Sequence, residues 1–213
     1  VGKSLVSMVE KLGVRAVSIS GKDGGLLKVK KKISLNKKKL SNQTTFLMMR
    51  KELLILNVVL NFHNQDFLYI AEKVLKYREE GADIIYTMDT HGPAYMDMQE
   101  GKKCPVVHCQ NGTDGWKLYG KTAETCKDAM TIGKHTFGSF DLAMMALNNG
   151  YDQIELCGVY MDVGVIANAV LLKTAQPEAE MLIDAHCVAG RNAKLKEEAL
   201  DVLESMQFTV MNR

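Results

Sequence analysis

The sequence contains no apolar run close to the roughly 18 residues that a membrane-spanning helix needs. Its five cysteines form no CxxC pair, and no secretory signal precedes them, so we expect reduced thiols in a cytoplasmic protein without a membrane partner. Aromatic residues are missing from the lysine-rich first 40 residues. This absence argues against nucleic-acid binding, because single strands bind by stacking on aromatic side chains.

The overall composition is ordinary for a soluble globular protein, with 46% hydrophobic and 24% charged residues. A chain of 213 residues can hold one domain with a sizeable core and is too short for two full ones. The net charge is only +2, but residues 1–40 carry 11 Lys and Arg against 2 acidic residues. Such a segment is either a solvated lysine-rich stretch or a basic arm, and we favour the first.

Strand-like and helix-like patterns alternate from residue 52 onward. The run "ELLILNVVLNF" is typical of a strand buried on both faces, and the helical pattern that follows it stops at Gly81. Further strands are predicted at 82–92, 151–161, 178–190 and 208–211, and further helices at 139–150, 163–175 and 192–206. This order predicts an α/β fold, a three-layer sandwich with a mainly parallel sheet.

Functional groups of a parallel sheet collect at the carboxyl ends of its strands. Asp89 and His91 follow one predicted strand, and Glu100 and His108 lie further along the same excursion. Two imidazoles and two carboxylates are suitable ligands for a divalent metal with open positions. From spacing alone, isolated histidines and acids in a loop are usually solvated or structural, and a metal site is the alternative.

Two further positions stand at element boundaries. Lys134 precedes a helix that we expect to begin near Ser139, with Ser139 as its N-cap and Asp141 in its first turn. The lysine could point into a cleft or be a surface charge. Gly164 lies where a strand passes into a helix, a position whose backbone N–H groups can stabilise an oxyanion but which here offers no nucleophile.

Four blocks in order resemble the isochorismatase-like cysteine hydrolases, in particular the nicotinamidases: "DTH…E…HCQNGTDGW", "KHTFGS", "IELCGVYMDVGVIANAVLLK" and "PEAEMLIDAHCVAG". The resemblance covers residues 53–213, and we assign 51–213 to this domain. It implies a six-stranded parallel sheet, an Asp–Lys–Cys triad that hydrolyses amides, and a homo-oligomer. It also implies that Asp89, His91, Glu100 and His108 bind zinc, manganese or iron, which holds the pyridine nitrogen of the substrate.

The triad is incomplete under this resemblance. Lys134 matches the lysine, but Asn61 in "VVLNFHNQDF" stands at the base position and Gly164 in "YMDVGV" at the nucleophile position. The amides of Tyr160 and Gly164 match the oxyanion hole. An asparagine cannot accept the proton and a glycine cannot attack a carbonyl, so we expect nicotinamidase-type activity to be weak or absent.

Residues 1–32 resemble a short internal stretch of acetylglutamate kinases, through "LGVRAVSISGKDGGLLKVKK", and residues 33–50 form a lysine-rich linker. Three hypotheses remain open. The chain is a weak or inactive nicotinamidase-like hydrolase, a non-catalytic protein that binds a metal and a small amide or pyridine ligand, or a degenerate fusion remnant.

Overall fold

The computed structural model describes residues 51–58 and 66–213. The predictions for residues 1–32, for the linker 33–50 and for Asn61 therefore lie outside the described residues. These described residues contain six strands: β1 (Glu52–Val58), β2 (Asp83–Asp89), β3 (Met130–Lys134), β4 (Gln153–Val159), β5 (Glu180–Ala189) and β6 (Thr209–Met211). The α-helices are α2 (Asp66–Glu79), α3 (Gln99–Lys103), α4 (Gly120–Thr125), α5 (Phe140–Asn149), α6 (Ile166–Ala175) and α7 (Ala193–Ser205).

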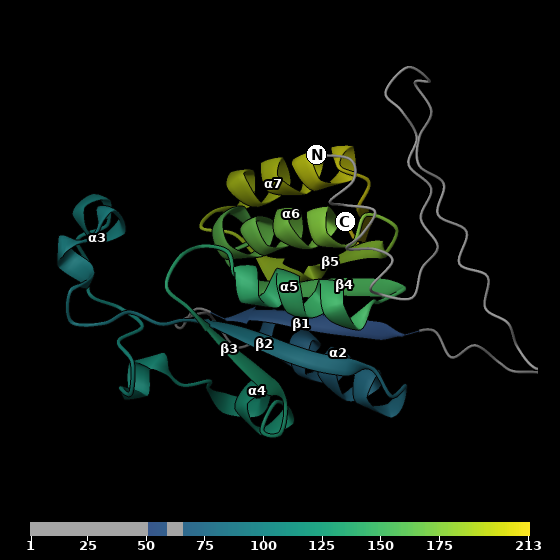
Figure 1. The fold of residues 1–213 in the computed structure, drawn as a ribbon, viewed down its shortest axis with the longest axis horizontal. Helices are drawn as coiled ribbons and strands as arrows, with labels where there is room; N and C mark the ends of the chain where they lie inside the picture. The colour runs from purple at the N-terminus through teal and green to yellow at the C-terminus, as the bar shows by residue number, and fades with distance from the viewer. Residues whose placement is uncertain (1–50, 59–65) are drawn as a thin grey trace, which may run out of the picture. The chain divides into compact units, whose positions relative to one another are not determined.

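The strands form one sheet in the order β3-β2-β1-β4-β5-β6, and every neighbouring pair is parallel (Figure 1). A parallel pair needs a crossover connection, and the helices supply these crossovers. The three-layer α/β fold predicted from the alternating pattern is thereby confirmed. All carboxyl strand ends consequently meet at one edge of the sheet.

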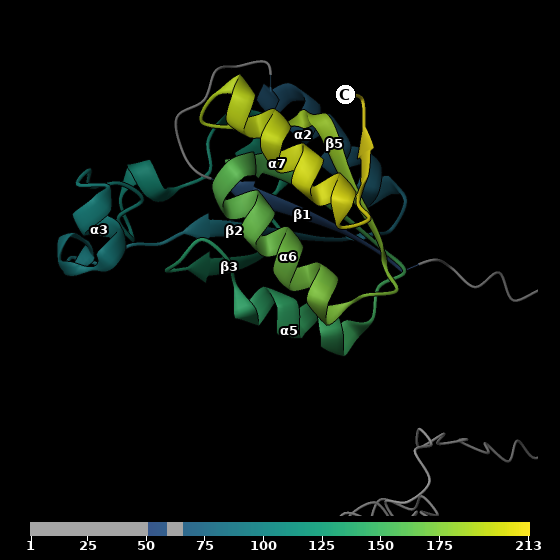
Figure 2. The same cartoon turned by 90° about the horizontal axis from the view of Figure 1, so that it is seen from above.

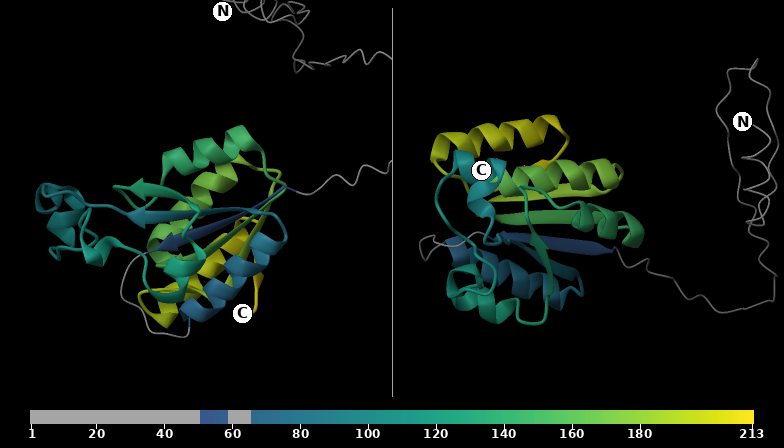
Figure 3. Two further views of the ribbon diagram at one scale, coloured as in Figure 1. Left: turned by 90° about the horizontal axis from the view of Figure 1, so that it is seen from below. Right: turned by 60° about the vertical axis from the view of Figure 1, so that its left-hand side comes forward.

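Helices cover both faces of the sheet (Figures 2 and 3). Successive strand residues point to opposite faces, so Leu53 and Ile55 pack under α5, α6 and α7, whereas Leu54 and Leu56 pack against α2. The strand β1 is therefore buried on both sides, as its unbroken apolar sequence predicts. Among the described residues, no helix combines the length and the apolar character needed to cross a bilayer.

The predicted helix boundaries agree with the local chemistry. At the start of α5, Ser139 Oγ accepts a hydrogen bond of 3.2 Å from Leu142 N, which confirms the predicted N-cap. The chain leaves α2 through Gly81, whose φ of +78° is readily adopted by glycine, and Ala82 N then donates to Tyr77 O.

The sequence pattern predicts no helix or strand between residues 93 and 138, and the structure differs there. This segment contains α3, α4 and the strand β3, and α3 lies beyond the carboxyl ends of the strands (Figures 1 and 2). The strand β3 lies at the edge of the sheet, and Met130 at its start is 56% exposed. An edge strand of five residues needs no apolar run, and the sequence pattern therefore does not reveal it.

Candidate active site

Four polar side chains share one face of the sheet at its carboxyl edge. Asn57 on β1 is the register partner of Thr87 on β2, and Asp89 on β2 is the register partner of Lys134 on β3. Thr87 and Asp89 are two residues apart on one strand, so they point to the same face. This is the face covered by α5, α6 and α7.

Lys134 points into the protein, so the alternative of a surface charge is excluded. Its side chain is 1% exposed, and its ammonium forms an ion pair with the carboxylate of Asp89. The same ammonium donates to Thr136 O at 3.4 Å. Burial lowers the pKa of Lys134 to about 8 because it disfavours the charged form, while contact with the Asp89 carboxylate works in the opposite direction.

Three of the four predicted metal ligands come together. His91, Glu100 and His108 each offer one ligand atom, and these atoms all lie within 4.8 Å of one another. The imidazoles of His91 and His108 meet edge to face, with ring centroids 4.7 Å apart. Asp89, the fourth predicted ligand, is not in this group and pairs with Lys134 instead.

The donor set fits a divalent cation. His91 is 3% exposed, and among the described residues its Nε2 atom has no hydrogen-bond partner. His108 Nδ1 lies 2.7 Å from the carbonyl of Val106, which can only accept, so the hydrogen is on Nδ1 and the lone pair on Nε2. Burial lowers the pKa of His91, which favours the neutral, metal-binding imidazole. Burial also raises the pKa of Glu100, a change that a bound cation would reverse.

The junction after β4 has no room for a side chain at Gly164. The chain turns there through a short π-helical segment, Met161–Val165, and Tyr160 O accepts hydrogen bonds from Val163 N and Val165 N. A Cβ atom on Gly164 would lie 2.6 Å from Asn57 Nδ2 and 3.2 Å from Asn57 Cγ. A side chain at position 164 would therefore collide with Asn57 unless Asn57 moved.

Asn57 is held by three hydrogen bonds in a fully buried network. Its Nδ2 donates to Val159 O (2.6 Å), and its Oδ1 accepts from Thr87 Oγ1 (2.9 Å) and Asn168 Nδ2 (3.2 Å). Asn168 Oδ1 in turn accepts from Ser139 N (2.9 Å) and so joins α6 to the start of α5. Sequence reasoning missed Asn57, although a single polar residue inside "ELLILNVVLNF" was a visible signal.

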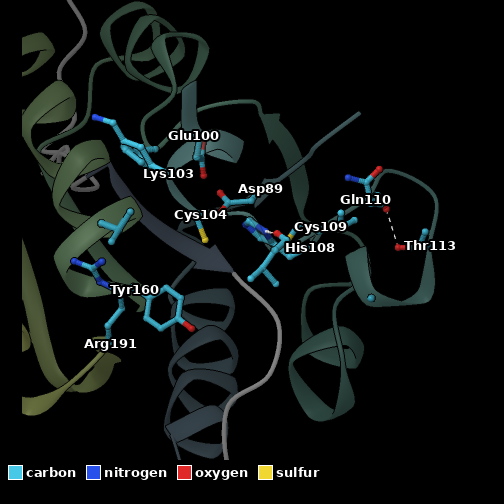
Figure 4. Close-up of a pocket in the computed structure, with 15 residues that line it drawn as sticks. Asp89, Glu100, Lys103, Cys104, His108, Cys109, Gln110, Thr113, Tyr160 and Arg191 are labelled. Atoms are coloured by element: carbon cyan, nitrogen blue, oxygen red, sulfur yellow. Dashed lines mark hydrogen bonds between the residues drawn. The ribbon is translucent and has the colours of Figure 1, made fainter. Parts of the chain in front are cut away.

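An open cleft of about 800 Å³ lies above this edge of the sheet (Figure 4). Asp89, Glu100 and His108 lie on one side of it, and Tyr160 and Arg191 on the other. The Arg191 guanidinium is held by Asp162, whose Oδ2 is 2.6 Å from Arg191 Nε. The cleft thus extends from the candidate metal ligands Glu100 and His108 to the strand–helix junction at Tyr160, and it is large enough for a small organic molecule.

The comparison with protein-family models decides which family this architecture represents. The model described as "Isochorismatase domain" matches residues 57–213, well over half of the chain. The chain belongs to the isochorismatase family. A comparison with curated proteins gives no match.

Solved structures of this family show the same fold at low sequence identity. The nicotinamidase/pyrazinamidase from Bacillus subtilis has a TM-score of 0.67 and 22% identity, over 77% of this chain and 100% of that one. The pyrazinamidase of Pyrococcus horikoshii, in complex with zinc, has a TM-score of 0.63 and 22% identity, over 76% and 99%. The N-carbamoylsarcosine amidase from Thermoplasma acidophilum has a TM-score of 0.58 and 20% identity, over 76% and 96%.

The five cysteines of this isochorismatase-family chain lie at two locations: Cys126, like Cys157 and Cys187, is on the α2 side of the sheet, and the other two are beside the cleft. Cys157 and Cys187 are buried on the α2 face of the sheet, opposite to Asn57, and burial raises the pKa of both thiols. Cys104 and Cys109 both line the cleft, but Cys109 is buried beside His108 whereas Cys104 is exposed. Cys104 is therefore the accessible thiol at the site among the described residues.

Proposed function

We propose that the chain is a member of the isochorismatase family that binds a divalent metal and a small amide or pyridine-type ligand in the cleft, and that it does not hydrolyse amides through a covalent intermediate. The observation that carries the proposal is the contact between Gly164 and Asn57: a Cβ atom would lie only 2.6 Å from the asparagine amide. The nucleophile is absent, and its space is occupied.

The chemistry of the remaining groups supports this proposal. Covalent amide hydrolysis needs a nucleophile that a neighbouring base activates. The amide of Asn57 cannot accept a proton as a carboxylate does, and its three hydrogen bonds all join buried groups of the protein. Lys134 is engaged with Asp89, so the one triad position that the sequence retains is held in an ion pair.

The metal group supports a binding role. Zinc, manganese or iron held by His91, Glu100 and His108 would supply a Lewis acid for a nitrogen or oxygen atom of the ligand. That the backbone amides of Tyr160 and Gly164 form an oxyanion hole, as the family resemblance implies, stays a prediction. In this proposal those amides would at most orient a carbonyl or carboxylate group of the ligand.

Two assays test the proposal together. The full chain is loaded with zinc or manganese, its metal content is measured, and binding of nicotinamide and nicotinate is followed by calorimetry. Ammonia release from nicotinamide is measured in parallel, with a Lys134→Met variant as the matched control. We expect bound metal and saturable ligand binding, with ammonia release no faster than in the control. Release that clearly exceeds the control would overturn the proposal.

A second candidate function rests on the exposed thiol in the cleft. Cys104 lies on the same side of the cleft as Asp89 and Glu100 and could act as a displaced nucleophile (Figure 4). This alternative predicts ammonia release that disappears in a Cys104→Ser variant and persists when Cys157, on the other face of the sheet, is changed to Ser. Activity that survives Cys104→Ser would exclude this thiol as the nucleophile.

The remaining assignments extend the proposal to the whole chain. We propose that residues 51–213 form the ligand-binding domain, that residues 1–32 are a kinase-like fragment joined by the linker 33–50, and that the protein is a cytoplasmic homo-oligomer. Light scattering of the full chain and of a 51–213 fragment tests the domain division and the oligomeric state. A fragment that fails to fold would contradict the division.

A further inference from the structure

The outer side of α5 exposes a stripe of large apolar side chains. Phe140, Met144 and Leu147 follow one another at intervals of four and three residues, so they share one side of the helix. Their exposed fractions are 77%, 53% and 50%. An apolar stripe of this kind marks an interaction surface, whereas single exposed apolar residues scattered over a protein do not.

The charges of the helices single out the same surface. The helices α5 and α6 carry one charged residue each, Asp141 and Lys173, whereas α2 and α7 carry six each. A helix at the surface of a soluble protein normally keeps a charged side toward water. All four helices cover the sheet, with α5 beside α6 (Figure 2), so the outer side of α5 differs from those of α2 and α7 in being suited to contact with protein.

The exposed area is in the range that a dimer needs. The three side chains of the stripe together expose about 300–400 Å², since one large side chain offers about 150–250 Å² in full. A standard interface buries about 800 Å² on each partner, and about 56–58% of that area is apolar. The stripe therefore supplies most of the apolar area of one partner, and Val170 on α6, which is 38% exposed, adds to it.

The two ends of α5 carry opposite charges. Asp141 is exposed in the first turn of the helix. At the other end, Lys51 Nζ donates at 3.1 Å to the carbonyl of Asn149, the last residue of α5. These two ends are about 12 Å apart along the helix axis, which is too far for an ion pair within one copy. Two copies of α5 packed antiparallel would instead bring each Asp141 to Lys51 of the other copy.

We propose that the outer side of α5 is the interface with a second copy of this chain, with the two α5 helices antiparallel about a two-fold axis near Met144. Met144 lies about midway between Phe140 and Leu147, so this axis sets Phe140 against Leu147 of the other copy. A two-fold dimer requires a surface that is complementary to itself, and a symmetric apolar stripe with opposite charges at its ends meets this requirement. This interface gives the homo-oligomer of the proposed function, on which it rests, a defined contact.

Two leucines that are each 50% exposed on a helix provide a matched test, Leu147 on α5 and Leu75 on α2. Leu147→Glu and Leu75→Glu introduce the same charge, and circular dichroism shows whether each variant is folded. Sedimentation velocity of the full chain over a range of concentrations gives the dissociation constant of the dimer. We expect Leu147→Glu to raise this constant by at least about a hundredfold, because two carboxylates enter an apolar interface, and Leu75→Glu by less than about threefold.

A charge exchange tests the antiparallel arrangement itself. Asp141→Lys sets like charges opposite each other at both ends of the interface and should weaken the dimer by about fivefold or more at low salt. Adding Lys51→Glu restores opposite charges, so the double variant should dimerise within about twofold of the parent. A double variant that dimerises no more tightly than Asp141→Lys alone would contradict antiparallel packing.

The outcomes separate this interface from the rest of the proposed function. A parent chain that stays monomeric at every concentration would overturn the interface and the homo-oligomer together, whatever its metal and ligand binding. An oligomeric parent in which Leu147→Glu weakens association no more than Leu75→Glu does would overturn the interface alone. A parent that dissociates through Leu147→Glu but binds no metal and no ligand would support the interface and overturn the binding function.

Discussion

Adding one carbon atom at Gly164 should destabilise the protein far more than adding it at an open glycine. In a Gly164→Ala variant, the new Cβ would lie 2.6 Å from Asn57 Nδ2, where ordinary heavy-atom contacts begin near 3.5 Å. Asn57 would have to move by roughly 1 Å. The end of a free side chain could do so at little cost, but this one is fixed by three buried hydrogen bonds.

The magnitude follows from two terms. Overpacking of a tight interior costs about 1–3 kcal/mol, and a buried polar group that loses its partner costs about 1–3 kcal/mol. The sum of the two terms predicts that Gly164→Ala lowers the free energy of unfolding by about 2–6 kcal/mol, measured by urea unfolding. Gly164→Cys should lose at least as much, because its sulfur atom adds to the same conflict.

Gly92→Ala is the matched control, since nothing lies within 4 Å of a Cβ atom at that position. It measures the effect of the added methyl group on the unfolded chain, which is typically below about 1 kcal/mol. In an Asn57→Ala background the steric term at Gly164 should vanish, giving a coupling of about 0.5–3 kcal/mol. If Gly164→Ala unfolds at the same urea concentration as Gly92→Ala, the reasoning about this contact is refuted.

Three further predictions concern other charged groups. Lys73 Nζ lies 2.6 Å from Glu155 Oε1 and 2.7 Å from Asp184 Oδ2. Lys73→Met would leave these buried carboxylates without their cation, so it should lower the free energy of unfolding by about 3–5 kcal/mol. An unchanged urea midpoint would contradict this prediction. Burial acts to raise the pKa of Asp184, but the hydrogen bond from Lys73 prevails and the pKa is lowered. The ionised Asp184 therefore stabilises the fold at pH values above its unfolded pKa of about 3.9. This contribution is lost as the pH falls through the lower pKa of the folded state. Acid unfolding of Asp184→Asn should therefore show a shallower pH dependence than that of the parent protein. Finally, a zinc ion in the cleft and Lys103 on its lining would both attract an anion, so calorimetry should show nicotinate binding about tenfold tighter than nicotinamide. The reverse order would contradict this electrostatic reasoning.

The fold was predictable because buried parallel strands and their crossover helices have distinct apolar patterns. Leu53 to Leu56 are all buried, and the sequence shows this as an unbroken apolar run. The strand β3 escaped prediction because it lies at the sheet edge and is largely exposed. Its pairing with β2 is a long-range contact that the local sequence pattern does not reveal.

The site was predictable as a set of residues but not as a set of contacts. Strand ends indicate Asp89 and Lys134, yet only the register of β2 and β3 shows that they face each other. The family resemblance matches the base position to Asn61, which lies outside the described residues. The asparagine that meets Gly164 is Asn57, because β1 pairs with β4 in a register that sets Asn57 beside Gly158.

The three candidate metal ligands, His91, Glu100 and His108, all belong to one continuous stretch of chain, residues 91–108. Its first residue, His91, forms an isolated parallel bridge with Gln110, just past its last residue, and α3 lies in its middle. An ion bound by all three side chains would close this stretch into a ring, as a covalent crosslink does. The entropy of closing such a ring rises only slowly with its length, so one ion can restrain the whole excursion. Loading the site would then be a local folding event, with backbone amide exchange slowing across residues 91–108 rather than only at the ligands.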